Sequence, residues 1–139
     1  MTDSTAAAEA AIAAFGRWSD AFNARDENAQ IAEMHFPHVR LADHRFQHWE
    51  TSDDFRARQD AMTDALRREG WHHTATDSVE AVQVGPTKVH LALRQSRRRE
   101  DGSEYTAFDT LWIFSLIDGR WGVQFRSSYL SGLVDLKRA

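Results

Sequence analysis

FDTLWIFSLIDGRWGVQFRSS (residues 108–128) is the stretch whose pattern decides the fold. Its Asp118-Gly119 pair is typical of a tight two-residue turn, in which both residues adopt positive φ. Two strands therefore meet at this turn, and the turn sets which residues face each other. The expected cross-strand pairs are Leu116 with Trp121, Phe114 with Val123, Trp112 with Phe125, and Thr110 with Ser127.

The two faces of this hairpin differ in composition. The face that carries the expected pairs is apolar and rich in aromatic residues, which indicates that it lines a core or a cavity. The opposite face is mixed, and it holds Asp109, Leu111, Ile113, Gln124, Arg126 and Ser128. A surface hairpin has a fully polar outer face, so this mixed face is expected to meet something else, such as a second subunit.

The composition excludes several classes of protein. The chain has 139 residues, which predicts a single domain over residues 1–139. A net charge of −4 offers no general attraction for nucleic acid or for an anionic membrane. No apolar run approaches the ~18 residues of a membrane span, and the first residues lack a signal pattern. The absence of cysteine excludes disulfides and thiolate sites. We therefore expect a cytoplasmic protein.

The rest of the chain predicts three helices and more strands. An apolar stripe at helical spacing covers residues 5–23, a short helix begins after Asp26, and a third helix covers residues 52–69. A small hairpin is expected at residues 36–49, and long strands at 71–84, 88–99 and 103–117. The pattern predicts an α+β fold, with three N-terminal helices on a mainly antiparallel sheet of four long strands plus the small hairpin.

Three stretches resemble the NTF2-like (SnoaL-like) superfamily, namely WSDAFNARD (residues 18–26), HFPHVRLA (35–42) and DGRWGVQFRSSY (118–129). The order of elements is similar over nearly the whole chain. The resemblance implies a cone in which a curved sheet wraps a long N-terminal helix. This superfamily includes ketosteroid isomerases, scytalone dehydratases, limonene-epoxide hydrolases, polyketide cyclases and non-catalytic members, so the fold does not name the chemistry.

Two of these enzyme classes require characteristic sets of catalytic residues. An isomerase-like site needs a tyrosine on the first helix, where this chain has none. It also needs an aspartate near the first strand, where this chain carries His38. An epoxide hydrolase-like site needs an Asp-Arg-Asp set, for which the chain offers Asp77, Arg94, Asp109 and Arg126. These residues are expected outside the cavity, so we interpret them as an ion-pair network.

Dehydratase-like chemistry needs histidines that exchange protons near neutral pH. Among the seven histidines, the candidates for a catalytic role are His35, His38 and either His72 or His73, with Arg40 beside them. His35 and His38 straddle a proline, so neither belongs to a helical metal-binding motif. We expect no metal and no cofactor. The basic run RQSRRRED (residues 94–101) has acidic neighbours, is interpreted as an exposed hairpin tip, and predicts no nucleic-acid site.

The apolar sheet face is expected to line a ligand cavity, because core aromatics near the mouth of a cone also form its walls. The expected ligand contacts are Trp18, Trp49, Gln95, Thr110, Trp112, Phe125, Ser127 and Tyr129.

The small hairpin decides what else touches a ligand. If Asp43-His44 is its turn, one face holds His38, Arg40, Gln47 and Trp49, and the other holds Val39, Leu41 and Phe46. With the first face inward, Arg40 holds an anionic or carbonyl group and His38 carries a proton. With the second face inward, the pocket is too apolar for acid–base work. Because Val39, Leu41 and Phe46 are what a core favours, we expect the second orientation.

The function that the sequence favours is the binding of a small hydrophobic or carbonyl-containing molecule in a small apolar cavity. One alternative is a small-molecule enzyme of isomerase, dehydratase or cyclase type that uses histidine and arginine. Another is a dimerising scaffold whose cavity is filled by its own side chains. A homodimer is expected through the outer sheet face, with Arg94, Asp109, Leu111, Ile113, Gln124 and Arg126.

Overall fold

The computed structural model describes residues 2–130 of the chain. Its elements in chain order are α1 (Thr2–Ala24), α2 (Glu27–Ile31), β1 (Met34–Ala42), β2 (Arg45–Trp49), α3 (Ser52–Arg68), β3 (His73–Val84), β4 (Lys88–Arg98), β5 (Glu104–Ile117) and β6 (Arg120–Tyr129). The strands form one six-stranded sheet in the order β2-β1-β6-β5-β4-β3. Among the strands of residues 2–130 only β1 and β6 pair in parallel, and this pairing joins the small hairpin to the long strands. The predicted α+β, mainly antiparallel architecture is confirmed.

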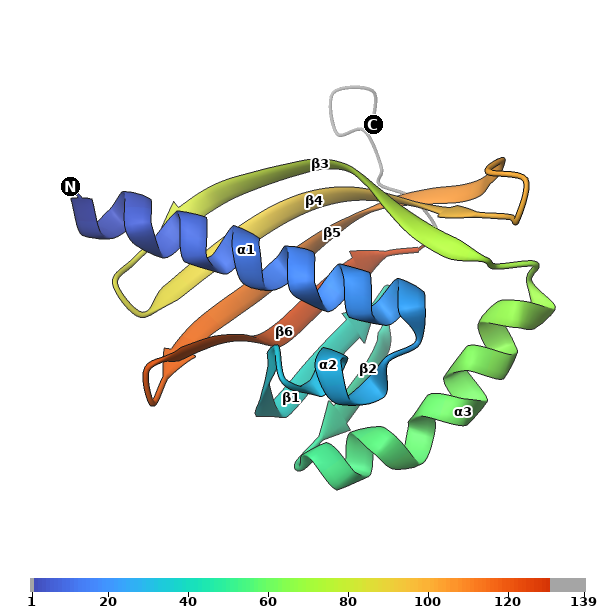
Figure 1. Cartoon of the computed structure of the whole chain (residues 1–139), viewed down its shortest axis with the longest axis horizontal. Helices are drawn as coiled ribbons and strands as arrows, with labels where there is room; N and C mark the ends of the chain where they lie inside the picture. The colour runs from blue at the N-terminus through green and yellow to red at the C-terminus, as the bar shows by residue number, and fades with distance from the viewer. Residues whose placement is uncertain (1, 131–139) are drawn as a thin grey trace.

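Helix α1 lies along one face of the sheet (Figure 1). Its buried residues near the N-terminus are small, with Ala7, Ala11 and Ala14 against the core strands. Further along, Phe15 and Trp18 meet Trp112 of β5 edge-on, with ring centroids 5.0 and 4.8 Å apart. Each such buried aromatic contributes about 2–3 kcal/mol of hydrophobic stabilisation. The core therefore lies between α1 and the middle of the sheet.

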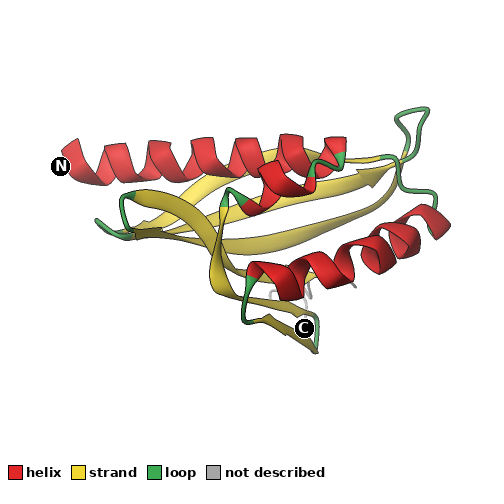
Figure 2. Cartoon of the chain, turned by 60° about the horizontal axis from the view of Figure 1, so that its bottom comes forward, coloured by secondary structure: helices red, strands yellow, loops and turns green. Residues whose placement is uncertain are grey.

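Helix α3 links the two edge strands of the sheet, because it follows β2 and precedes β3. It begins with a capping box, in which Thr51 and Asp54 bond each other's backbone N–H groups at 3.2 Å. It ends before Gly70, whose φ of +94° favours glycine, as predicted. At 17 residues α3 is ~25 Å long, about the width of the sheet. Figure 2 shows α3 standing apart from α1.

The long hairpin matches the prediction only near its turn. Asp118 and Gly119 have φ of 52° and 75°, and Leu116 faces Trp121 and Phe114 faces Val123, as expected. Beyond this point Gln124 is an extra residue, because Ile113 pairs with Phe125. This β-bulge shifts every later residue of β6 by one position and so to the other face. Trp112 consequently faces Arg126 and Thr110 faces Ser128, and the two predicted pairs beyond the bulge are wrong.

The bulge changes which residues line the two sheet faces. Arg126 and Ser128 are buried on the concave face, at 7% and 6% exposure. The predicted ligand contacts Phe125, Ser127 and Tyr129 pair with the outer-face residues of β5 instead. Arg126 is therefore not part of the outer face that the sequence assigned to the dimer, and these three residues are not part of the cavity wall.

The small hairpin has the predicted turn but not the expected orientation. Ala42 pairs with Arg45 around the Asp43-His44 turn, so the face shared by His38, Arg40, Gln47 and Trp49 is as predicted. That face points inward, since His38 and Trp49 are buried and Phe46 is 68% exposed. The expectation that this face points outward is wrong. Trp49 packs on Phe55 of α3, at 5.4 Å between ring centroids, and so gives this face its apolar contact with the core.

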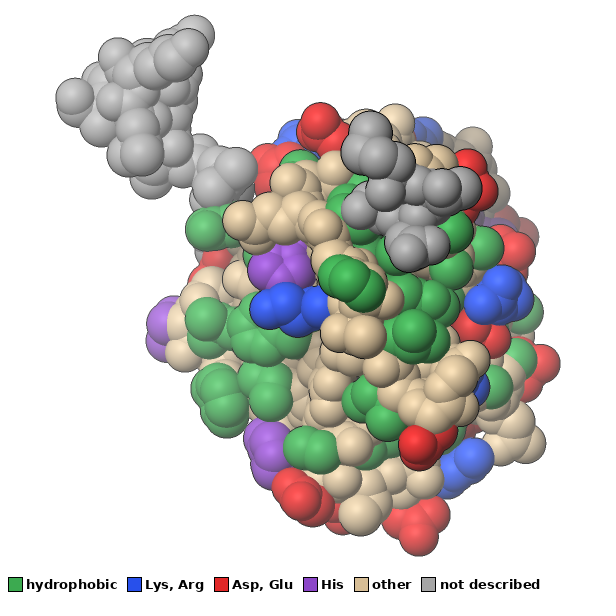
Figure 3. Space-filling view, turned by 90° about the vertical axis from the view of Figure 1, so that its left-hand side faces the viewer, with side chains coloured by type: hydrophobic (Ala, Val, Ile, Leu, Met, Phe, Trp, Pro, Cys, Tyr) green, Lys and Arg blue, Asp and Glu red, His purple; other side chains and the backbone are tan. Residues whose placement is uncertain are grey.

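The surface carries side chains of mixed character. On the end of the molecule seen in Figure 3, acidic, basic and hydrophobic side chains are interspersed. None of the helices in residues 2–130 is both long and apolar enough to cross a membrane. The basic run is also less exposed than expected, because Arg97 and Arg98 belong to β4 and only partly reach solvent.

Candidate functional site

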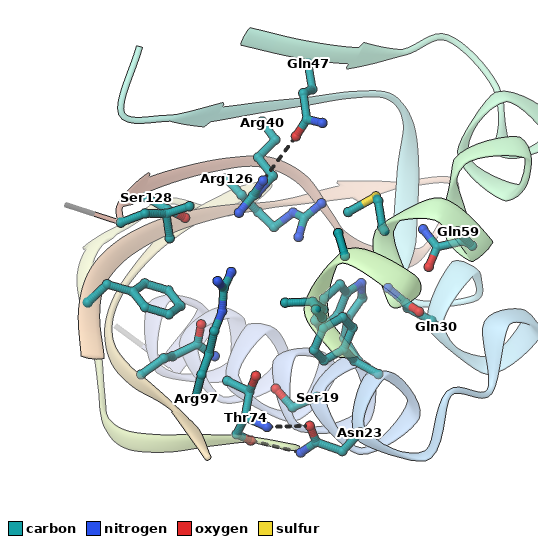
Figure 4. A pocket seen from close by; sticks show the side chains of 18 of the residues that line it. Ser19, Asn23, Gln30, Arg40, Gln47, Gln59, Thr74, Arg97, Arg126 and Ser128 are labelled. Carbon is teal, nitrogen blue, oxygen red and sulfur yellow. Dashed lines mark hydrogen bonds between the residues drawn. The ribbon is translucent and has the colours of Figure 1, made fainter. Parts of the chain in front are cut away.

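A pocket of about 220 Å³ lies between α1, α3 and the concave face of the sheet. Its apolar walls come from both helices and from the sheet, and include Trp18, Phe22, Phe55, Met62, Leu66 and Trp112. Polar side chains reach it from several elements, and Figure 4 shows Arg40 and Arg126 together, Arg97 pointing toward them from below, and Gln30 and Gln59 at the right. Apolar walls with a few converging polar groups are typical of small-molecule sites.

The charge of the pocket is opposite to that of the whole chain. Five arginines line it, namely Arg25, Arg40, Arg45, Arg97 and Arg126, whereas the chain has a net charge of −4. Among the described lining residues the only carboxylate is Glu69. Glu69 Oε1 already accepts hydrogen bonds from Arg97 Nη1 at 3.3 Å and from the Tyr105 hydroxyl at 2.9 Å. The pocket is therefore an electropositive region that favours an anion.

Arg126 is the most deeply buried of these cations. Its guanidinium carbon lies 5.3 Å from the Trp18 ring centroid and 5.6 Å from that of Trp112, in cation–π contact. Burial, and then the charge of Arg40, lowers the pKa of Arg126 well below its ordinary value. Its Nη2 has no hydrogen-bond partner in the described part of the chain. A guanidinium stays charged in proteins, so a buried cation lies here without a counter-charge.

His38 holds Arg126 in place from behind. Arg126 Nε donates to His38 Nε2 at 3.0 Å, so the imidazole proton lies on Nδ1, which donates to the Val123 carbonyl oxygen at 3.1 Å. Burial, followed by the charge of Arg126, lowers the pKa of His38 well below 6.5. The imidazole is thus neutral, both of its nitrogens are used, and it does not line the pocket. His38 therefore positions the Arg126 side chain and is not placed to exchange a proton with a ligand.

Arg40 and Arg97 complete the basic side of the pocket. Arg40 Nη1 donates to Gln47 Oε1 at 3.1 Å, a neutral partner on the neighbouring strand β2. Burial, and then the charges of Arg97 and Arg45, lower the pKa of Arg40 to about 10. Arg97 is held by Glu69 and lies over the Phe108 ring at 5.3 Å. Arg40 and Arg126 thus repel each other, which an anion between them would relieve.

The opposite side of the pocket carries uncharged hydrogen-bond donors. Gln30 and Gln59 are buried at 2% and 5% exposure, on α2 and α3. Gln59 Nε2 and Trp18 Nε1 are buried and have no hydrogen-bond partner among residues 2–130. Buried polar groups in folded proteins are normally paired, so each of these donors requires an explanation.

The structure brings together part of the predicted ligand-binding set. Trp18, Gln95 and Trp112 line the pocket, and so does Arg40. Trp49 is buried beside the pocket, against His38 and Phe55. Thr110 is also buried beside it, and its hydroxyl bonds the Trp112 indole N–H at 3.0 Å and the Ser128 hydroxyl at 2.8 Å. The side chains of Trp49 and Thr110 therefore support the walls from outside.

The other catalytic candidates lie away from the pocket. His35 is bonded through Nε2 to the Arg120 carbonyl oxygen at 2.8 Å and through Nδ1 to the Arg120 side chain at 3.1 Å. His73 shares a hydrogen bond with the adjacent His72, 2.9 Å between their Nδ1 atoms, at the exposed start of β3. Neither side chain lines the pocket. Both histidines have structural partners instead.

The epoxide hydrolase-like residues do not gather into one site. Arg94 and Asp109 form the predicted ion pair on the outer face, 3.0 Å between Nη1 and Oδ2. Asp77 pairs with Arg98 at 3.6 Å, and Arg126 lies on the concave face. In the described part of the chain, no group of three or more His, Cys, Asp or Glu side chains is arranged to hold a metal ion.

Sequence reasoning missed Arg97, Arg126, Gln30 and Gln59. A usable signal existed for Arg97, since Leu91, Leu93 and Gln95 precede it at alternate positions of one inward face. No such signal existed for Arg126, because the bulge at Gln124 reverses the alternation before it. The glutamines lie on two separate helices, and only the packing of α2 and α3 brings them to one pocket.

Solved structures with the same fold come from several bacteria. An NTF2-like protein with a cystatin-like fold from Novosphingobium aromaticivorans has a TM-score of 0.72 at 15% identity, covering 95% of this chain and 84% of that chain. An NTF2-like protein of unknown function from Pseudomonas putida has a TM-score of 0.71 at 14% identity, covering 96% and 91%. A ketosteroid isomerase-like protein from Erwinia carotovora atroseptica has a TM-score of 0.62 at 18% identity, covering 87% and 93%. At such identities the likeness shows the fold alone.

The sequence itself matches one family. No curated protein is significantly similar to this chain. Residues 8–126 match the family described as NTF2-like protein (DUF6841), which is most of the chain and includes the elements that build the pocket. The resemblance of the three sequence stretches to NTF2-like proteins is thereby confirmed, and the chain belongs to this NTF2-like family.

Proposed function

We propose that this NTF2-like domain binds a small organic anion, with a carboxylate beside Arg126 and Arg40 and an apolar body between the aromatic walls. The observation that carries the proposal is the buried guanidinium of Arg126, whose Nη2 has no partner in residues 2–130. Removing a charge from water costs several kcal/mol unless it is paired. A ligand carboxylate supplies the missing counter-charge and accepts hydrogen bonds in the planar geometry that guanidinium favours.

The remaining walls support an apolar body for this ligand. Trp18 and Phe22 stack with ring centroids 5.0 Å apart, and the sheet contributes Trp112 and Phe108. A volume of about 220 Å³ suits a molecule of one or two rings. The proposal thus keeps the small hydrophobic or carbonyl-containing ligand that the sequence favours, and adds a negative charge to it.

Three observations favour binding over the alternatives. General acid–base catalysis needs a group that is free to exchange a proton with the ligand, whereas Glu69 is held by Arg97 and Tyr105. His38 lies behind Arg126 with both ring nitrogens bonded. A scaffold with a filled cavity is less well supported, because Trp18 and Trp112 leave the pocket open beside them.

The test compares cinnamate with cinnamamide, which have nearly the same shape and differ in charge. Isothermal titration calorimetry near neutral pH is expected to show cinnamate binding at least about 10-fold more tightly, since a hydrogen bond to a charged group contributes about 1.5–3 kcal/mol. Added salt is expected to weaken the binding of cinnamate but not that of cinnamamide. Equal affinities for the two compounds would reduce the site to apolar capture and overturn the proposal.

A further inference from the structure

Two uncharged hydrogen-bond donors in the pocket indicate which polar groups the ligand has. Gln59 Nε2 and Trp18 Nε1 are both buried and both unpartnered within the described residues, and both side chains line the pocket. An indole N–H and an amide NH₂ donate hydrogen bonds and do not accept them. An unpaired buried donor lowers the stability of the folded protein by about 1–3 kcal/mol. An acceptor supplied by a ligand would remove this cost.

Gln59 is separated from the anion site, whereas the Trp18 ring lies against Arg126, 5.3 Å from the guanidinium carbon to the ring centroid. In Figure 4 the side chains of Gln59 and Gln30 enter the pocket from one side, and Arg40 and Arg126 enter from another. Gln59 comes from α3, which bridges the open side of the sheet, whereas Arg126 comes from β6. One carboxylate at Arg126 therefore does not also serve Gln59.

We propose that the ligand is an oxo acid, with its carboxylate at Arg126 and a ketone or similar carbonyl oxygen, remote from that carboxylate, at the Gln59 donor. At Gln59 a carbonyl oxygen is preferred over a hydroxyl, because the unpartnered Nε2 offers protons and a carbonyl only accepts them. This inference rests on the proposed binding of an organic anion and specifies the class of that anion. A site built around buried donors rejects an analogue that lacks the acceptor.

The experiment uses two ligands of matched shape, para-acetylcinnamate and para-isopropenylcinnamate, which differ by C=O against C=CH₂. On the wild-type chain, calorimetry is expected to show the acetyl compound binding about 10-fold more tightly than the isopropenyl compound. In Gln59→Leu this ratio is expected to fall to about 2-fold or less, while unsubstituted cinnamate keeps its wild-type affinity.

A second variant protects the test against a folding defect. Gln59→Glu keeps the size of the side chain but replaces the NH₂ donor by a carboxylate oxygen, so it is expected to lower the acetyl-to-isopropenyl ratio as well. Equal wild-type affinities for the two matched compounds would overturn this inference and leave the anion site standing, provided that cinnamate binds more tightly than cinnamamide. Failure of cinnamate to bind would overturn the proposed function, and the oxo-acid inference with it.

Discussion

Arg94 and Arg126 lie on the two strands that flank β5, and their surroundings are opposite. Arg94 is on the outer face, 45% exposed, with Asp109 at 3.0 Å. Arg126 is on the concave face, 7% exposed, against two indole rings and a neutral histidine, with Nη2 unpartnered in the described chain. An exposed ion pair contributes about 0–1 kcal/mol, whereas a buried unpaired cation lowers stability by more. The difference supports the proposal that Arg126 contacts a ligand, whereas Arg94 forms a surface ion pair.

The largest expected effect is on ligand binding. Arg126→Met removes the charge but keeps an unbranched side chain of moderate length, and it is expected to weaken cinnamate binding at least about 100-fold, or ~3 kcal/mol. Arg94→Met is the matched control, with the same substitution on the outer face, and is expected to change the affinity less than about 2-fold. Calorimetry measures the cinnamate affinity of both variants. A similar loss of affinity in both would contradict the assignment of the anion site to Arg126.

The same variants separate binding from folding. Because an apolar side chain replaces an unpaired buried charge, Arg126→Met is expected to raise the Tm of the free protein. Arg94→Met is expected to leave the Tm almost unchanged. A lower Tm for Arg126→Met would mean that the guanidinium stabilises the fold through His38 and the indole rings.

The second effect concerns the outer face and its assembly. We propose that this face forms a homodimer, since Leu111, Ile113 and Phe125 leave half-buried apolar area beside the Arg94–Asp109 pair. Leu111→Glu is expected to weaken the dimer about 30-fold, or ~2 kcal/mol, as measured by sedimentation at micromolar concentration.

Phe46→Glu supplies the control for the assembly. Phe46 is 68% exposed but lies on the small hairpin β1–β2, outside the proposed patch, so this change is expected to leave the dimer intact. A wild-type protein that sediments as a monomer at these concentrations would end the dimer proposal.

The smallest expected effect is on the pH dependence of folding stability, and it concerns His38, which bonds Arg126. The pKa of His38 is lowered in the folded state by burial and by the charge of Arg126, so below pH 6.5 the unfolded chain binds one more proton there. Folding stability is therefore lost as the pH falls below 6.5, by about 1 kcal/mol per pH unit from this group. His38→Gln is expected to remove that part of the slope.

Denaturant titrations between about pH 7 and pH 5 measure this slope. The same substitution at the exposed His44 is the control and is expected to leave the slope as in the wild type. An unchanged slope in His38→Gln would mean that His38 is not held neutral between Val123 and Arg126.

The local elements were predictable from local residue patterns. The Asp118-Gly119 and Asp43-His44 turns, the cap at Thr51 and the helix end at Gly70 depend on φ preferences and side-chain bonds within a few residues. The order of helices and strands, and the apolar face of α1, follow from periodicity alone. These elements do not depend on distant contacts.

The site was only partly predictable. Trp18, Gln95 and Trp112 were expected at a cavity and line the pocket, since strand alternation and helical spacing place them, whereas the expected orientation of the small hairpin turned Arg40 outward. The roles of His38 and Arg126 were not, because each depends on the other across 88 positions of sequence. The parallel pairing of β1 with β6 brings the two side chains together, and no residue near either one signals that pairing.

The amino-acid sequence by itself determined the elements, their turns and the α+β class, because these depend on forces between near neighbours in the chain. The tertiary structure decided which face of each hairpin looks inward. One extra residue at Gln124 turned Arg126 from the outer face to the pocket, and the contact of Trp49 with Phe55 turned His38 and Arg40 inward. A strand has two faces of nearly equal access, and only the packing partners of the whole fold choose between them.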